Sequence, residues 1–275
     1  MTDVGWRPFA TPLHYLGLPG SVAPPIWREG RIRAELAALR SRRPAPPVPP
    51  EPGAPVLVVP GFAAGDDRVA LLRDWLREGG WDVRPTGITD GRRCSSRDLA
   101  IVEETLVRVH AETGRPVTLV GHSRGGLFAK VLAVRHPDRV RALVTLGAPL
   151  TDPFGIHLAV RLLTLWMATM TRLGHRDWVR NCPFGDCCRQ VHDDLLAPTP
   201  AQVPFTSIAS RSDGIVSWQA SQDPDAHCVT VDSSHGGLVA HPGVWAAIAA
   251  ALTHPPRRSG PGVSGERGNR PSPAP

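Results

Sequence analysis

Long apolar runs are absent from this sequence of 275 residues. The longest, Leu162 to Met170, lies between Arg161 and Arg172 and is much shorter than the ~20 residues that a membrane-spanning helix needs. The first residues also lack the charged segment and the apolar segment of a secretory signal. We therefore expect no transmembrane segment, and the cytoplasm is the expected location.

Lysine is almost absent, and Lys130 is the only one. The net charge of +6 comes from the two ends of the chain, because residues 56–254 contain 20 basic and 20 acidic residues. Arg, Ala, Pro and Gly abound, which indicates codon composition rather than a polyanion-binding surface. No basic face with interleaved aromatic residues is visible, so we expect no nucleic-acid partner.

Cysteine is scarce, with five residues, three of them within residues 182–188. Zinc would need a second pair of ligands, and only His175 and His192 lie near. A disulfide, with Cys228 as one candidate partner, would need an oxidising compartment. Reduced, half-buried thiols are the default, Cys94 is expected to be an ordinary loop thiol, and no metal or cofactor is implied.

The two ends of the chain differ from its middle. Residues 1–43 form an arm whose apolar positions at helical spacing lie among arginines, and residues 44–55 form a linker with seven prolines. Such a basic amphipathic helix could rest on an anionic membrane or on the protein's own surface, and we favour the second. Residues 255–275 have the composition of a disordered tail. The folded domain is expected at residues 56–254.

Within that domain, short β-branched apolar segments alternate with amphipathic helices. The expected strands are residues 56–59, 82–88, 117–120, 140–146, 205–209 and 227–231. Four helices are expected beside these strands. Asp66 is expected to cap the first and Ser95 or Ser96 to cap the second, and of the other two, one follows the turn at Ser123 and one begins at Pro242. This alternation predicts a mostly parallel sheet flanked by helices, with its active site at the carboxyl ends of the strands.

One strand-to-helix turn carries the pattern Gly-x-Ser-x-Gly, with Ser123 at its centre. A serine on so tight a turn projects its hydroxyl beyond the sheet, at a helix N-terminus that favours negative charge. Its hydroxyl needs a base and an orienting acid, both at the ends of later strands. His235 and Asp213 follow the last two predicted strands and supply these roles.

We expect the other acidic and histidine residues that could fill these roles to be structural or solvent-exposed instead. His122 is expected to be structural, Asp232 to hydrogen-bond within its loop, and His241 to cap a helix or lie on the surface. Asp223 and Asp225 are expected in a solvated turn. For the oxyanion formed on attack, the expected donors are the backbone N–H groups of Arg124, after the nucleophile, and of Phe62, after the first strand.

Five segments together resemble the α/β-hydrolase superfamily, in its lipase/esterase branch, over about residues 55–253. They are Val58-Val-Pro-Gly-Phe62, Gly121-His-Ser-Arg-Gly-Gly126, Leu146-Gly-Ala-Pro149, Ser212-Asp-Gly-Ile-Val216 and Ser234-His-Gly-Gly237. The resemblance implies the same triad and the same oxyanion donors. Pro60 stands where many relatives carry histidine, and because the backbone donor is kept, this departure bears on subfamily rather than on activity.

A cap or lid insertion is expected at about residues 150–203, with a helix over 154–173 that is apolar on most sides. We expect this helix either to roof an acyl-binding pocket through Trp166, Met167 and Met170 or simply to pack on the sheet. The predicted activity is hydrolysis of a small-molecule ester, lipid-like esters included, through an acyl-enzyme. The alternatives are an acyltransferase with the same triad and a non-catalytic binding protein, and the oligomeric state is open.

Overall fold

The computed structural model describes residues 25–172 and 186–253, without the side chains of residues 165, 167–172, 186 and 187. The predicted tail at 255–275, the start of the arm and residues 173–185 of the predicted cap lie outside the described residues. No helix within the described part of the chain is long and apolar enough to cross a membrane.

Within the described residues, six strands form one parallel sheet in the order β2-β1-β3-β4-β5-β6. The strands are β1 (Pro55–Val59), β2 (Asp82–Arg84), β3 (Val117–His122), β4 (Val140–Leu146), β5 (Phe205–Ser210) and β6 (His227–Val231). The predicted parallel sheet is thereby confirmed. Because the strands are parallel, the loops that follow β1, β3, β5 and β6 all emerge at one edge of the sheet.

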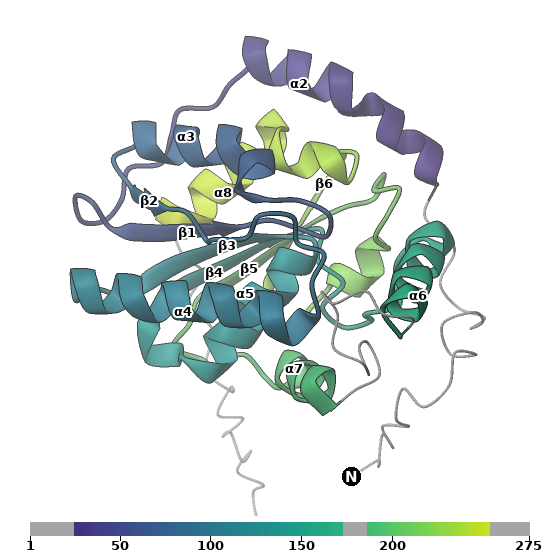
Figure 1. The fold of residues 1–275 in the computed structure, drawn as a ribbon. Helices are drawn as coiled ribbons and strands as arrows, with labels where there is room; N and C mark the ends of the chain where they lie inside the picture. The colour runs from purple at the N-terminus through teal and green to yellow at the C-terminus, as the bar shows by residue number, and fades with distance from the viewer. Residues whose placement is uncertain (1–24, 173–185, 254–275) are drawn as a thin grey trace, which may run out of the picture.

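Helices cover both faces of this sheet (Figure 1). On one face lie α4 (Ser95–Thr113), α5 (Arg124–Arg135) and α7 (Asp186–Leu196). On the other lie α3 (Ala70–Glu78) and α8 (Pro242–Thr253), with α2 (Ile32–Ser41) outside them. Helix α6 (Leu158–Arg172), within the segment predicted to be a cap, stands beyond the end of the sheet rather than over a face. The described residues also form short 3-10 turns: η1 (Ile26–Arg31), η2 (Asp66–Val69), η3 (Pro137–Arg139), η4 (Trp218–Ser221) and η5 (Gly236–Val239).

The helices form where the sequence places an apolar stripe. In α4, Leu99, Val102 and Leu106 are buried against the sheet, and the helix ends at Gly114, whose φ of 63° is the left-handed conformation that glycine adopts most easily. In α3, the ring of Trp75 stacks on that of Trp245 from α8, with centroids 4.7 Å apart. Burial of such side chains stabilises the fold by about 1.5–3 kcal/mol each.

The proline-rich linker packs against α3 and the residues just after it, instead of standing away from the domain. The indole N–H groups of Trp75 and Trp81 donate to the carbonyl oxygens of Pro44 (2.9 Å) and Pro47 (2.8 Å). Proline has no N–H but keeps its carbonyl acceptor, so this segment can be fixed by donors from the domain. The linker is thereby held against the body of the protein.

The predicted cap role of Asp66 is wrong. The residue that precedes η2 is Gly65, and no side chain caps the turn. The Asp66 carboxylate instead accepts from the Thr86 N–H (3.2 Å), the Thr86 hydroxyl (3.0 Å) and the Gly87 N–H (3.1 Å). Donors in the loop after β2 compete for this carboxylate and satisfy it better than the short 3-10 turn would.

Candidate active site

Ser123 lies on a strained turn between β3 and α5. Its φ of 53° and ψ of −123° are rarely adopted by a residue with a side chain. The Ser123 N–H donates to the Leu146 carbonyl (2.8 Å), which fixes the turn against the end of β4. A Cβ added at Gly121 would lie 2.5 Å from the Gly125 carbonyl oxygen, and one added at Gly125 would lie 2.3 Å from the Val59 carbonyl oxygen, so neither position of this turn has room for a side chain.

The loops after β5 and β6 bring Asp213 and His235 together. His235 Nδ1 lies 2.7 Å from Asp213 Oδ2, and the Asp213 Oδ1 atom accepts from the N–H groups of Ile215 and Val216, both at 2.7 Å. The two side chains are 10% and 2% exposed. Since a carboxylate can only accept, Nδ1 carries the proton and Nε2 is left as the basic nitrogen.

The pKa of His235 is raised above its ordinary value. Burial alone would lower this pKa, but the charge and hydrogen bond of Asp213, with a further contribution from Glu29, outweigh it. Asp213 thus stabilises the protonated ring that would form when the imidazole accepts a proton.

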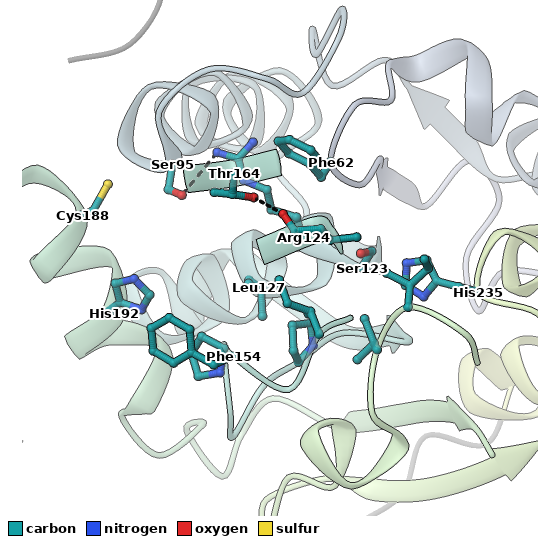
Figure 2. A pocket seen from close by; sticks show the side chains of 16 residues that line it. Phe62, Ser95, Ser123, Arg124, Leu127, Phe154, Thr164, Cys188, His192 and His235 are labelled. Carbon is teal, nitrogen blue, oxygen red and sulfur yellow. Dashed lines mark hydrogen bonds between the residues drawn. The ribbon is translucent and has the colours of Figure 1, made fainter. Parts of the chain in front are cut away.

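Ser123 and His235 line the same cavity, and Figure 2 shows them at one end of it. Among the described residues the Ser123 hydroxyl forms no hydrogen bond. Such contacts are often long before substrate binds and tighten in the complex. The structure therefore brings the three predicted residues to one edge of the sheet, with the acid and base already paired.

His122 has the structural role expected from the sequence. Its ring lies 4.8 Å from that of His235, between centroids, and its Nε2 is 3.0 Å from the His235 carbonyl oxygen. Burial, with a smaller contribution from His235, lowers the pKa of His122 to about 3. The ring is therefore neutral and donates Nε2–H to that carbonyl, which helps to fix the His235 backbone.

Phe62 and Arg124 flank Ser123 on two sides. Phe62 lies in the loop after β1, between Gly61 and Ala63, whose φ is 54°. A Cβ added at Gly61 would lie 3.1 Å from Ser123 Cβ, so this loop runs directly against the serine. Arg124 is the first residue of α5, and the N–H of a first helical residue has no partner within its helix.

The Arg124 side chain anchors the loop that precedes α4. It donates to the carbonyls of Gly91 (2.6 Å) and Arg93 (2.7 Å), the Ser95 hydroxyl (3.2 Å) and the Asp98 carboxylate (2.9 Å). Burial raises the pKa of Asp98 even though the Arg124 charge opposes it. The side chain thus holds the start of α4 against the serine turn.

The cavity beside Ser123 has a volume of about 350 Å³ and a mostly apolar lining. Its apolar walls come from the turn loops, α5, the entry to the cap, and α6: Phe62, Leu127, Pro149, Pro153, Phe154, Ile156, Val160, Ile215 and Val216. Ile156 also pairs with Val216 as an isolated antiparallel bridge, which joins the cap entry to the loop that carries Asp213.

Helix α6 faces this cavity through Val160 and Thr164. Trp166 is 59% exposed and is not among the lining residues, so its role in substrate binding stays a prediction. The side chains of Met167 and Met170 lie outside the described part of the structure. The helix begins at Leu158, four residues later than expected, because Asp152 to Gly155 form a turn.

The remaining acidic candidates have structural partners. Asp223 is not in a solvated turn as predicted, because its carboxylate is 1% exposed and lies 2.5 Å from Lys130 Nζ. Asp225 accepts from the Thr199 N–H (2.7 Å), and Asp232 pairs with Arg31 (3.1 Å). His241 Nδ1 accepts from the Gly243 N–H (3.1 Å) at the start of α8, as a cap does.

The cysteine expectations are changed in one respect. Cys94 is buried directly before α4, with its Sγ 3.6 Å from that of Cys188, so it is not an ordinary loop thiol. Cys228, the partner suggested from the sequence, faces the carbonyls of Asp223 and Ala226 instead. His175 and Cys182 lie outside the described residues. No group of three or more potential metal ligands occurs among the residues that are described.

Sequence reasoning missed two residues beside this site, Glu29 and Glu35 of the arm. Both carboxylates contact the loop that carries His235. A signal was present for Glu35, because it shares a helix face with the apolar Ile32, Leu36 and Leu39, where an acidic residue needs a partner. No comparable pattern marked Glu29.

The comparisons with known proteins agree with this architecture. Residues 81–173 match the family model described as the α/β hydrolase fold, a segment that includes Ser123 and ends before Asp213. A crystal structure of the mature Bacillus licheniformis lipase BlEst2 is 18% identical, covers 76% of this chain and 96% of that chain, and has a TM-score of 0.56. A pyrethroid hydrolase from Sphingobium faniae JZ-2 is 20% identical, with coverage of 74% and 98% and a TM-score of 0.50. The chain has the α/β-hydrolase fold, as its five sequence segments indicated.

Proposed function

We propose that this protein hydrolyses carboxylic esters through an acyl-enzyme. The Ser123 oxygen attacks the ester carbonyl while His235 Nε2 accepts the hydroxyl proton. His235 then returns that proton to the departing alcohol, and water, deprotonated by the same nitrogen, releases the acid and restores the serine. Asp213 orients the ring and stabilises its positive charge, and the N–H groups of Phe62 and Arg124 stabilise the oxyanion.

One observation carries this proposal: a serine on a strained strand-to-helix turn shares an apolar cavity with a histidine whose Nδ1 is bound to a buried carboxylate. A binding protein has no need of this combination. The cavity volume of about 350 Å³ is within the range of small-ligand sites and would accept a modest acyl group. The neighbouring structures support the fold and leave the ester to be found by assay.

The test is labelling by a fluorophosphonate, which modifies only activated serines. Wild type should be labelled and should hydrolyse short p-nitrophenyl esters, whereas Ser123→Ala should do neither while keeping its thermal unfolding midpoint. Product that appears only with an added alcohol would identify an acyltransferase. Absence of labelling in folded wild type would favour a non-catalytic binding protein.

The cap helix is proposed to set the preference for acyl length. Val160 and Thr164 face the cavity, and Trp166, Met167 and Met170 follow on the same helix. Polar replacements of Trp166, Met167 and Met170 should change the relative rates on esters of graded length if these residues contact the acyl chain. An unchanged preference would restrict the cap's contribution to Val160 and Thr164.

A further inference from the structure

One carboxylate of the N-terminal arm bridges the two loops that carry Asp213 and His235. Glu29 lies in η1, and its Oε1 atom accepts from the N–H of Gly214 (2.9 Å) and from that of His235 itself (2.7 Å). Its Oε2 atom accepts from the Gly236 N–H (3.0 Å). These donors are 185 to 207 residues away in the sequence. Hydrogen bonds to a charged acceptor are about twice as strong as those between neutral groups.

Glu35, two turns further along the arm, holds the residue before His235. Its Oε1 atom accepts from the Ser234 N–H (2.7 Å), and its Oε2 atom accepts from the Ser234 hydroxyl. Glu35 is only 5% exposed, and on the other side Arg31 makes a paired contact with Asp232 (3.1 and 3.2 Å). The arm therefore contacts the loop before and after the histidine.

Glycines in these loops make the close approach possible. A Cβ added at Gly214 would lie 3.0 Å from Glu29 Oε1, and one added at Gly236 would lie 3.0 Å from Ile32 Cδ1. A Cβ at Gly237 would collide with the Glu35 carboxylate. The small residues around the histidine are thus matched to the arm that covers them.

We propose that Glu29 and Glu35 are positioning residues that hold His235 and Asp213 in register for catalysis, so that the arm is part of the active site's support. This inference rests on the proposed function. A displacement of about 1 Å in a reacting group can lower the rate on the order of a hundredfold, and the loops' N–H groups would lose their acceptors without the two carboxylates.

The charge of Glu29 gives this role a signature that a merely structural contact lacks. The ionisable groups that face His235 are Asp213 from the loop after β5, Glu29 from η1 and His122 from the serine turn. Although burial lowers the pKa of His235, Asp213 and then Glu29 raise it. Removal of the Glu29 charge should therefore move the acid limb of the activity profile to lower pH.

The experiment compares Glu29→Gln, Glu29→Asp and Glu35→Gln with the matched control Glu104→Gln, which changes an exposed glutamate on α4. For each protein the thermal midpoint, kcat and KM on a short p-nitrophenyl ester, and the pH profile of kcat/KM are measured. We expect Glu29→Gln to lower kcat at least about tenfold with little change in KM and to shift the acid limb downward. Glu35→Gln should lower kcat without shifting the limb, and Glu104→Gln should match wild type.

Glu29→Asp keeps the charge but shortens the reach, so it should lower kcat and leave the acid limb near that of wild type. Wild-type kcat and an unshifted limb in folded Glu29→Gln would overturn the proposal. If that variant does not fold, full kcat in Glu29→Asp would overturn it instead. A wild type that neither labels with fluorophosphonate nor hydrolyses esters would remove the proposed function and this inference together, whereas active wild type with indifferent Glu29 variants removes the inference alone.

Discussion

The ion pair between Lys130 and Asp223 offers a measurable test of how the fold is held together. Lys130 lies on α5, and its Nζ is 2.5 Å from Asp223 Oδ2, with side-chain exposures of 5% and 1%. The pair joins α5 to the segment between η4 and β6. Lys130→Met would leave the Asp223 carboxylate buried without its counter-charge, which typically costs about 3–5 kcal/mol. At about 2–4 °C per kcal/mol for a chain of this size, the unfolding midpoint should fall by roughly 6–20 °C.

The double variant Lys130→Met/Asp223→Asn should recover most of this loss, because no buried charge remains without a partner. The asparagine oxygen can still accept from the Asp225 N–H, which Asp223 Oδ1 accepts at 2.9 Å in the native protein. In the single variant the Asp223 carboxylate is buried without a counter-charge, so it binds a proton more readily in the folded state than in the unfolded state. Folding then takes up a proton, so the stability of Lys130→Met relative to wild type should fall as the pH rises from about 5 to about 8.

Urea unfolding at several pH values measures these differences in the free energy of unfolding, provided that the m-value, the slope of that free energy against urea concentration, is the same in each variant. Arg108→Met is the matched control, because Arg108 is 52% exposed in a helix-surface pair with Glu112 and should change stability by less than about 0.5 kcal/mol. A Lys130→Met variant within about 1 kcal/mol of wild type, or a double variant no more stable than the single one, would refute the reasoning.

Three further predictions concern the site. The acid limb of kcat/KM should lie above 6.5, the ordinary pKa of histidine, because the pKa of His235 is raised, and a limb below that value would contradict this assignment. Gly237→Ala should lower the thermal midpoint and the labelling rate because its methyl group collides with an arm carboxylate, whereas Gly30→Ala, with nothing within 4 Å of the added Cβ, should do neither. Val160→Trp should slow hydrolysis of long acyl esters more than short ones by filling the cavity, and equal effects from the 44% exposed control Leu163→Trp would argue against that reading.

Local patterns in the sequence were sufficient for most of the fold. The strand at 140–146 was predicted at its observed bounds and the helix that ends at Gly114 at its observed end, because β-branched runs and helical stripes report burial directly. The predicted cap at Ser95 or Ser96 is wrong, since the residue before this helix is Cys94 and no side chain caps it. The positions of Asp213 and His235 after successive strands followed from the same patterns. Parallel strands bring their carboxyl ends to one edge, so the topology converted sequence order into spatial proximity.

Long-range pairing of charges could not be predicted in this way. Nothing near Asp223 in the sequence indicates Lys130, which is 93 residues away, and its surroundings of Gln, Pro and Asp are those of an exposed turn. Glu29 lies among arginines, where a solvated helix face is the ordinary expectation. Such contacts depend on how whole elements dock, and periodicity along one element carries no information about the partner that another element supplies.

The two halves of the candidate site are held by different means. The Ser123 turn follows a central strand whose neighbours β1 and β4 are paired in register, Val59 beside Gly121 and Leu146 beside His122. Ala63 and Ser123 are the non-glycine residues in the described part of the chain that have positive φ. The packing of these strands maintains that conformation, at a cost of about 1–3 kcal/mol for each residue.

The loop that carries His235, in contrast, follows β6, the last strand of the described sheet, whose residues are exposed or half-buried. A further strand would have fixed this loop by backbone hydrogen bonds. The arm carboxylates of Glu29 and Glu35 supply acceptors there instead, which is why a helix outside the sheet can determine the geometry of the proposed base.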